Sequence, residues 1–201
     1  MILVAFQGSS IDGEEYTDVV NSAQHAPSWL DTTVSAWSTY GLAVFAMLMV
    51  VGWWRARRVG AESAVTALAV PLVVVAAYGI DSLLKLAVRE NRPCQTLRVV
   101  TLEACPVRGD WSFPSNHATI AAAAAVALFF VSRRLGAVAV VAALAMAVSR
   151  VWVGVHYPHD VVAGVVVGAL LALGAMVLLK RWPESLTNRI TATRLRPLLM
   201  S

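Results

Sequence analysis

The sequence predicts an all-α fold, a polytopic bundle of about five transmembrane helices that follows an N-terminal interfacial segment. Of its 201 residues, 58% are hydrophobic and 14% are charged, whereas soluble domains carry about a quarter charged residues. The mean hydropathy is +0.68. The apolar residues gather in runs close to the roughly 20 that a helix needs to cross a bilayer. These observations exclude a water-soluble globular chain.

The apolar runs predict five spans in chain order, with several residues of tolerance at each end. The third is short for a crossing, but Ala118–Val131 is uninterruptedly apolar, so we expect a membrane-buried helix there. Pro71 falls inside the second span, where neighbouring helices can satisfy the freed carbonyl, and predicts a kink without a break. The spans are Val34–Trp54, Ala64–Ala87, His117–Val131, Leu135–Val153 and Pro158–Leu179.

Basic residues mark one end of the predicted bundle as cytoplasmic, because short loops rich in Lys and Arg stay inside. Ten of the sixteen lie at that end: Arg55, Arg57, Arg58, Arg133, Arg134, Lys180, Arg181, Arg189, Arg194 and Arg196. We therefore expect a multi-pass plasma-membrane protein with its N-terminus outside and its C-terminus in the cytoplasm. Residues 1–201 would form one domain, with an outer interfacial segment over 1–33, an outer loop over 88–116 and a cytoplasmic tail over 180–201.

The net charge of +4 does not indicate nucleic-acid binding, because the basic residues flank apolar runs instead of forming a solvated patch. The two cysteines, Cys94 and Cys105, lie in one polar segment of the predicted outer loop. Two cysteines exclude a disulfide-dense scaffold and a four-cysteine zinc site. In an oxidising compartment they favour a disulfide with each other, the alternative being two free thiols.

Polar residues with a chemical role cluster at the predicted outer end. Lys85 and Arg92 are seven residues apart, so both would lie on one face if the second helix persists past Ala87. Pro93 disfavours the α conformation at Arg92 and predicts that the helix ends there. Two cations would then point the same way, as phosphate binding requires.

Two further stretches complete this cluster. Ser115 or Asn116 can cap the third span, whose N-terminal N–H groups make an anion site next to His117. The fourth span ends in Arg150, and Asp160 lies near the start of the fifth, close enough to His156 to fix its tautomer. Three cations, two histidines and an orienting carboxylate at one membrane face indicate phosphoryl transfer.

These residues form motifs that resemble the three signatures of the type 2 phosphatidic acid phosphatase superfamily. The motifs are Lys85-(six residues)-Arg92-Pro93, Pro114-Ser115-Asn116-His117 and Ser149-Arg150-(five residues)-His156-(three residues)-Asp160. The resemblance implies a metal-independent, cofactor-free phosphatase in which His156 attacks phosphorus and Asp160 orients it. His117 would protonate the leaving group and then activate water. The phosphoryl oxygens would be held by Lys85, Arg92, Arg150, Ser115 and the N–H of Asn116.

One residue departs from the family pattern, because Asn116 stands where glycine is commonest. The change puts the loop geometry in question more than the mechanism, since a backbone N–H is expected to act there. The segments 21–31 and 150–158 look like bacterial undecaprenyl-diphosphate phosphatases, which implies hydrolysis of an undecaprenyl or decaprenyl diphosphate to the monophosphate at the outer leaflet. Phosphatidylglycerophosphate, phosphatidate and polyprenyl-phosphoribose phosphate are alternative substrates in the same reaction class.

Other classes of protein remain as alternatives. A transporter could use the same cations to bind an anion, but it explains neither histidine and no inverted repeat is visible. A catalytically lapsed scaffold does not explain the intact motifs. The two histidines His156 and His159, with Asp160 as a carboxylate, could ligate a metal, although no further ligand is obvious nearby and the phosphatase motif does not need His159. Asp81 could pair with Lys85 four residues later, or be an ordinary interfacial residue.

Overall fold

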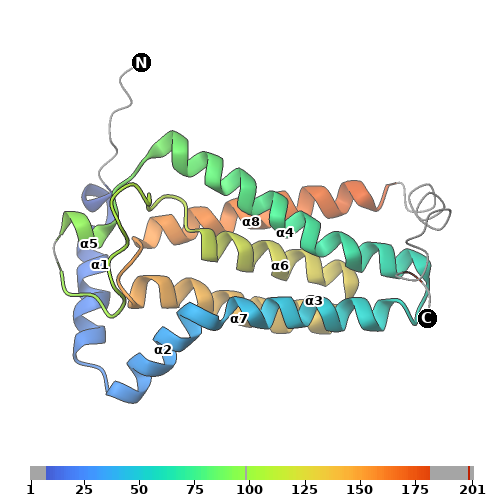
Figure 1. The fold of residues 1–201 in the computed structure, drawn as a ribbon, viewed down its shortest axis with the longest axis horizontal. Helices are drawn as coiled ribbons and strands as arrows, with labels where there is room; N and C mark the ends of the chain where they lie inside the picture. The colour runs from blue at the N-terminus through green and yellow to red at the C-terminus, as the bar shows by residue number, and fades with distance from the viewer. Residues whose placement is uncertain (1–7, 98, 182–198, 200–201) are drawn as a thin grey trace.

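The computed structural model describes residues 8–97, 99–181 and 199, and all regular structure in this part is helical. The helices are α1 (Ser9–Gln24), α2 (Ser28–Tyr40), α3 (Leu42–Ala56), α4 (Ala61–Val88), α5 (Pro93–Thr96), α6 (Asn116–Val131), α7 (Arg133–Trp152) and α8 (Pro158–Leu179). The predicted all-α fold is confirmed. Figure 1 shows α3, α4, α6, α7 and α8 running along the long axis, with α1 crosswise at one end.

By length and apolar composition, three helices can cross a membrane: α4 with its continuation to Thr96, α7 and α8. A fourth span results if α2 and α3 count as one. The remaining predicted span, α6, has 16 residues and is shorter than a crossing requires. Its apolar side chains are nevertheless covered, because α6 packs against α3, α4, α7 and α8 at the centre of the bundle.

The sequence predicts a span over Val34–Trp54, and the structure forms this stretch from parts of two helices, α2 and α3. The chain bends by 53° between α2 and α3, at Gly41. A Cβ at Gly41 would lie 2.4 Å from the Trp37 carbonyl oxygen and 2.8 Å from Cε of Met146. Only glycine therefore allows the bend to pack so closely against α7. An apolar run reveals no such bend, since glycine does not interrupt hydropathy.

Small residues let α6 lie deep in the bundle. Ala121–Ala125 are all buried, and Gly168 of α8 approaches so closely that a Cβ there would lie 2.2 Å from the Thr119 carbonyl oxygen. In membranes, where lipid is as apolar as the protein, such close contact is a main source of helix association. This packing also brings the first turns of α6 and α8 together.

The second span is one continuous helix, α4, with Pro71 inside it, as expected. It ends at Val88, because Arg89 adopts the left-handed conformation (φ 54°) and donates its N–H to the Lys85 carbonyl at 3.0 Å. Lys85 and Arg92 would share one face only if the helix continued to Arg92, and α4 ends before that residue. Arg92 extends from the loop, immediately before Pro93 at the start of α5.

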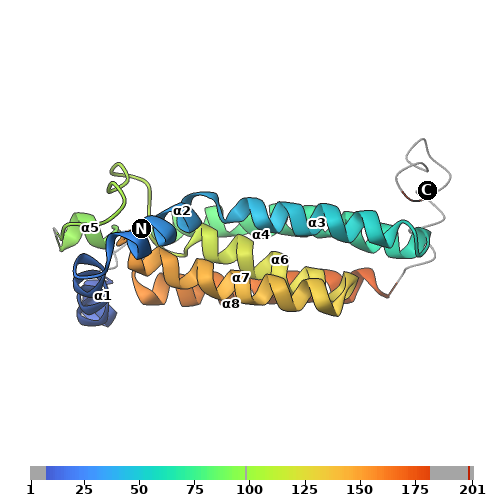
Figure 2. The ribbon, with the colours of Figure 1, turned by 90° about the horizontal axis from the view of Figure 1, so that it is seen from below.

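The two ends of the bundle differ in chemistry. At one end, here called the site end, α4 and α7 finish and α6 and α8 begin, with α1, α5 and the 99–115 loop over them (Figures 1 and 2). At the opposite end Arg57 lies over the Trp53 ring at 5.1 Å and Arg58 over the Trp54 ring at 5.4 Å. Of the predicted tail 180–201, only Lys180, Arg181 and Leu199 lie within the described residues.

Candidate active site

His156 and Asp160 form a buried pair at the site end. Pro158 begins α8, so Asp160 lies in its first turn and accepts the Tyr157 N–H at 2.8 Å, closing the helix N-terminus. Asp160 Oδ2 also lies 3.3 Å from Nδ1 of His156. His156 is 2% exposed and Asp160 is fully buried. The helix start therefore places the carboxylate at a defined ring nitrogen of the histidine.

The other nitrogen of His156 faces a cation. Nη1 of Arg92 lies 3.1 Å from Nε2. A guanidinium only donates, so Nε2 accepts and the neutral ring carries its proton on Nδ1, toward Asp160. Burial first, and the positive charges of Arg92 and Lys85 next, hold the pKa of His156 well below its usual range. The imidazole is thus neutral, with the Nε2 lone pair directed at the cationic group.

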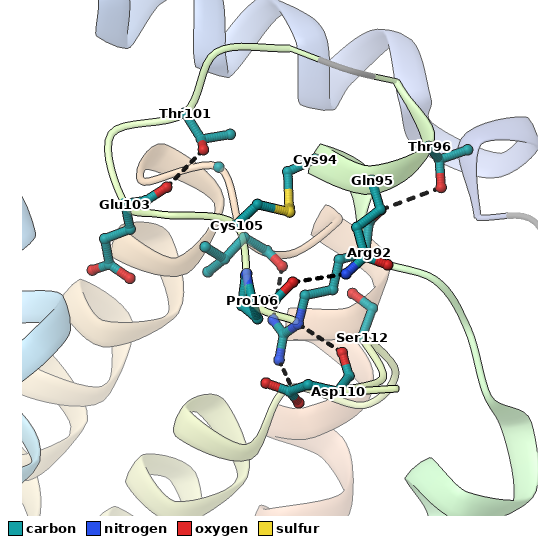
Figure 3. The surroundings of a disulfide bond; sticks show 12 residues. Arg92, Cys94, Gln95, Thr96, Thr101, Glu103, Cys105, Pro106, Asp110 and Ser112 are labelled. Carbon is teal, nitrogen blue, oxygen red and sulfur yellow. Dashed lines mark hydrogen bonds and ion pairs between the residues drawn. A yellow bond between two sulfur atoms is a disulfide. The ribbon is translucent and has the colours of Figure 1, made fainter. Parts of the chain in front are cut away.

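Arg92 is held by the loop that follows α5. Its Nε donates to the Asp110 carbonyl at 2.9 Å, and Nη2 pairs with Asp110 Oδ1 at 3.0 Å. Figure 3 shows this guanidinium pointing toward Asp110, next to the disulfide between Cys94 and Cys105. The disulfide closes the loop between Arg92 and Asp110. It therefore links the loop that carries Asp110, the ion-pair partner of Arg92, to α5, the helix that begins directly after Arg92.

Lys85 points from the last turn of α4 into the same region. Its Nζ donates to the carbonyl oxygens of Trp111 at 2.6 Å and Ser112 at 3.0 Å. The alternative pairing with Asp81 is not what the structure shows. Asp81 Oδ1 instead accepts from the Thr119 hydroxyl at 2.7 Å, which links α4 to α6. Lys85 is 7% exposed, so the ammonium lies in the buried site and not at a lipid interface.

Arg150 is the third cation, at the end of α7. Its Nη1 donates to the Ser38 hydroxyl of α2 and lies 3.5 Å from Glu103 Oε2 of the loop that precedes α6. The residue is 7% exposed. Within the described part of the chain, its Nε has no hydrogen-bond partner. Arg150 therefore keeps a donor available in a buried position.

The start of α6 supplies the predicted anion site. Ser115 is the N-cap residue, and its backbone N–H donates to the Asp160 carbonyl at 3.0 Å, joining α6 to α8. The Ser115 hydroxyl is buried without a hydrogen-bond partner among the described residues, and so is the side-chain oxygen of Asn116. His117 follows in the first turn, where Arg150 and Arg92 both act on it electrostatically. All the predicted site residues thus lie at the site end.

Sequence reasoning missed Ser112. Its hydroxyl donates to Asp160 Oδ2 and lies 3.4 Å from His156 Nδ1, and its backbone N–H donates to the Glu90 carbonyl at 2.8 Å. A serine in a loop carries no periodic signal. Only its position just before Phe113 and Pro114, at the edge of the second motif, could have indicated it.

A second missed group surrounds His159, which the motif reading set aside. Ligand atoms of Glu90, His159 and Asp160 lie within 4.8 Å of one another and could hold a metal ion. His156 is not part of this group, so the histidine pair considered from the sequence is not what the structure brings together. Glu90 was missed because neither periodicity nor motif spacing singles it out.

Buried cations around a neutral, oriented histidine, on a helical membrane bundle, define a membrane phosphatase that acts on phosphate esters. The chain belongs to the PAP2 superfamily, whose family model matches residues 64–184. It is a multi-pass membrane protein and a hydrolase of that family.

The relatives agree with this assignment. Undecaprenyl-diphosphatase BcrC of Bacillus subtilis is 31% identical over 78% of this chain and 79% of its own length. Decaprenylphosphoryl-5-phosphoribose phosphatase of Mycobacterium tuberculosis is 40% identical over 50% of this chain and 53% of its own. A transmembrane PAP2-type phosphatidylglycerolphosphate phosphatase from Bacillus subtilis has a similar fold, with a TM-score of 0.63 at 20% identity over 85% of this chain and 87% of that one.

Proposed function

We propose that this PAP2 phosphatase hydrolyses a polyprenyl diphosphate, such as the undecaprenyl or decaprenyl carrier, to the monophosphate at the outer leaflet. Undecaprenyl-diphosphatase BcrC, which is 31% identical over 78% of this chain, acts on undecaprenyl diphosphate by its name. The observation that carries the chemistry is the arrangement of His156, with Asp160 at Nδ1 and Arg92 at Nε2.

The reaction has two steps. Nε2 of His156 attacks the terminal phosphorus, the bond from phosphorus to the bridging oxygen breaks, and His117 gives a proton to the departing polyprenyl monophosphate. His117 then takes a proton from water, whose oxygen attacks phosphorus and breaks the phosphorus–nitrogen bond. Inorganic phosphate leaves and His156 is neutral again. Asp160 stabilises the charge that the ring gains in the first step.

The phosphoryl oxygens would be held by donors that the site keeps buried. Nε of Arg150 and the Ser115 hydroxyl have no partner among the described residues, and the backbone N–H of Asn116 lies in the first turn of α6. Lys85 and Arg92 add positive charge to the same region. Donors preorganised around the developing charge lower the barrier without reorganisation at the moment of reaction.

Two features support the outer leaflet. The Cys94–Cys105 disulfide lies at the site end, and disulfides persist in oxidising compartments. The opposite end carries Arg57, Arg58 and Arg133 on short connections, as cytoplasmic ends do. An extracytoplasmic site would meet polyprenyl diphosphates released on that side of the membrane.

A second candidate substrate is a polyprenyl-phosphoribose phosphate, because the Mycobacterium tuberculosis phosphatase is 40% identical over half of this chain. In that substrate the leaving group is a sugar hydroxyl, whereas a polyprenyl diphosphate releases a phosphate. The less acidic leaving group depends more strongly on protonation by His117. The two candidates therefore differ in how much activity a His117→Ala variant retains.

The proposal is tested by phosphate release from purified protein in detergent with EDTA present. The panel contains a polyprenyl diphosphate, a polyprenyl-phosphoribose phosphate, phosphatidylglycerophosphate and phosphatidate. Highest kcat/KM on the diphosphate, lost in His156→Ala and kept in His25→Ala, supports it. His25 is an exposed residue of the α1–α2 connection and serves as the matched control. Highest kcat/KM on another lipid would overturn the substrate, and full activity of His156→Ala would overturn the mechanism.

A further inference from the structure

His159 lies beside the proposed machinery and is surrounded by carboxylates from different parts of the chain. Its Nδ1 lies 2.7 Å from Asp12 Oδ1 of α1, and its Nε2 lies 3.1 Å from Glu90 Oε1 of the α4–α5 connection. Nε2 also lies 3.5 Å from Oδ1 of Asp160, the next residue. The ring stacks on Tyr157, with centroids 5.4 Å apart. The imidazole is therefore fixed in both position and plane.

The charge of this cluster identifies the form of the ring. Both ring nitrogens face carboxylates, and only the doubly protonated imidazolium can donate from both. Glu90 and Asp160 are fully buried, where an ionised carboxylate is costly without a positive partner. A single cationic His159 serves both. It also satisfies Asp12, whose side chain is 13% exposed.

The two oxygens of Asp160 have different partners. Oδ2 accepts from the Tyr157 N–H and the Ser112 hydroxyl and faces Nδ1 of His156. Oδ1 has no hydrogen-bond partner among the described residues, and its ion-pair partner is His159 at 3.5 Å. The carboxylate plane is thus set from both sides, and rotation about the Asp160 side chain would break the contact with His156.

We infer that His159 is a positioning residue: as an imidazolium bridging Asp12 and Glu90, it holds Oδ1 of Asp160 so that Oδ2 stays aimed at His156. Glu90 strengthens this role, because its backbone carbonyl accepts the Ser112 N–H at 2.8 Å while its side chain binds His159. Ser112 and His159, two of the partners of the Asp160 carboxylate, are therefore both connected to Glu90. The inference rests on the proposed role of His156 as nucleophile.

The N-terminal helix α1 contributes to the positioning of His159. Asp12 interrupts α1 with a non-helical backbone (φ −143°, ψ 33°), and its two carboxylate oxygens bind the backbone N–H and Nδ1 of His159, each at 2.7 Å. Gly8 is packed so tightly that a Cβ would lie 1.8 Å from Glu90 Oε1. The Tyr16 hydroxyl adds a hydrogen bond to the Gly154 carbonyl at 2.8 Å. Docking of α1 thereby contributes to catalysis, although no residue of α1 needs to touch substrate.

The test measures kcat, KM and the vanadate inhibition constant for His159→Gln, Glu90→Gln and Asp12→Asn, with His25→Gln as the control. We expect kcat to fall about 100-fold in His159→Gln, the effect of misplacing a catalytic group by about 1 Å. KM should change little, because the phosphate ligands are untouched, whereas the vanadate inhibition constant should rise with the loss of kcat, because a transition-state mimic requires His156 in its attacking position. Asp12→Asn, the mildest substitution, should lower kcat in the same way if His159→Gln does not fold.

A double-mutant cycle separates positioning from a general structural role. If His159 acts through Asp160, then Asp160→Asn combined with His159→Gln should be about as slow as Asp160→Asn alone. Losses that multiply, or unchanged kcat in both His159→Gln and Asp12→Asn, would overturn the inference. Stoichiometric metal in the purified wild type that is lost from His159→Gln would also overturn it, since the ring would then be a ligand and not a cation. The proposed function fails separately, through full activity of His156→Ala.

Discussion

Nη1 of Arg92 lies 3.1 Å from Nε2 of His156, the nitrogen that the proposed mechanism uses as nucleophile. The same Nη1 donates to the Val155 carbonyl at 2.9 Å, which keeps the guanidinium beside the ring. The arrangement keeps the ring neutral, because a second positive charge there would face Arg92 directly. When a phosphoryl group arrives, one N–H of Arg92 can pass from the nitrogen lone pair to a phosphoryl oxygen. The movement that frees Nε2 of His156 for attack thereby also brings Arg92 to the phosphoryl oxygen, whose negative charge it stabilises.

Asp160→Asn should lower kcat by about 10⁴-fold, the effect of a mis-set tautomer at an orienting carboxylate. The amide can donate to Nδ1 and shift the ring proton to Nε2, where it removes the lone pair. Phosphate release in detergent measures the loss, and the thermal unfolding midpoint reports whether the fold is kept. Ser112→Ala should lower kcat less, because Tyr157 and His159 still hold the carboxylate. A Ser112→Ala variant slower than Asp160→Asn would contradict this order.

Arg150→Ala should lower kcat/KM by about 10² to 10³-fold, as expected when a charged donor to the developing phosphoryl charge is removed. Vanadate mimics the trigonal-bipyramidal transition state, so its inhibition constant should rise in proportion. Arg108→Ala, which removes an exposed arginine of the loop before α6, is the matched control and should leave both values unchanged. Unchanged vanadate inhibition in an inactive Arg150→Ala variant would exclude a transition-state contact.

The depressed pKa of His156 predicts a loss of stability in acid. Below about pH 6.5 the unfolded histidine takes up a proton that the folded, buried ring does not, so stability is complete above that pH and falls below it. The free energy of unfolding should therefore be lower at pH 5 than at pH 7.5. The thermal midpoint of His156→Gln should accordingly fall less over this range than that of the wild type. Parallel curves for the two proteins would show that His156 is not buried in its neutral form.

The membrane orientation is checked by labelling single cysteines in a background that lacks Cys94 and Cys105. Glu14→Cys, on α1, should react with an impermeant thiol reagent in intact cells, and Arg133→Cys, at the opposite end, should not. Both positions are exposed in the folded chain, so protein burial does not protect either. The opposite pattern would place the site in the cytoplasm and remove the outer-leaflet substrate.

Much of the site could be predicted because its members lie in short local patterns. Pro158 predicts the start of a helix and hence the four-residue spacing that brings Asp160 to His156. Arg92 lies beside His156 for a reason other than helical spacing, since a left-handed Arg89 ends α4 early and the loop carries Arg92 inward. The motif alone predicted that Arg92 belongs to the site, without any argument from helical geometry.

What the sequence did not reveal depends on contacts between distant segments. Asp12 and His159 are 147 positions apart, and Ser112 and Asp160 are 48 apart. No local periodicity connects such pairs, because they meet only after α1 and the 99–115 loop pack on the end of the bundle. The bend at Gly41 was missed for a related reason, because it is the fit against Met146 that requires a glycine there.

Trapping the covalent intermediate tests the central claim most directly. His117→Ala should slow the water step, so rapid quenching with a radiolabelled phosphate ester that has an activated leaving group should leave phosphate on the protein. The account predicts an acid-labile, alkali-stable label on His156, absent when His156→Ala is added to His117→Ala. Turnover of the same ester without any label on His156 would contradict the account and indicate direct attack by water.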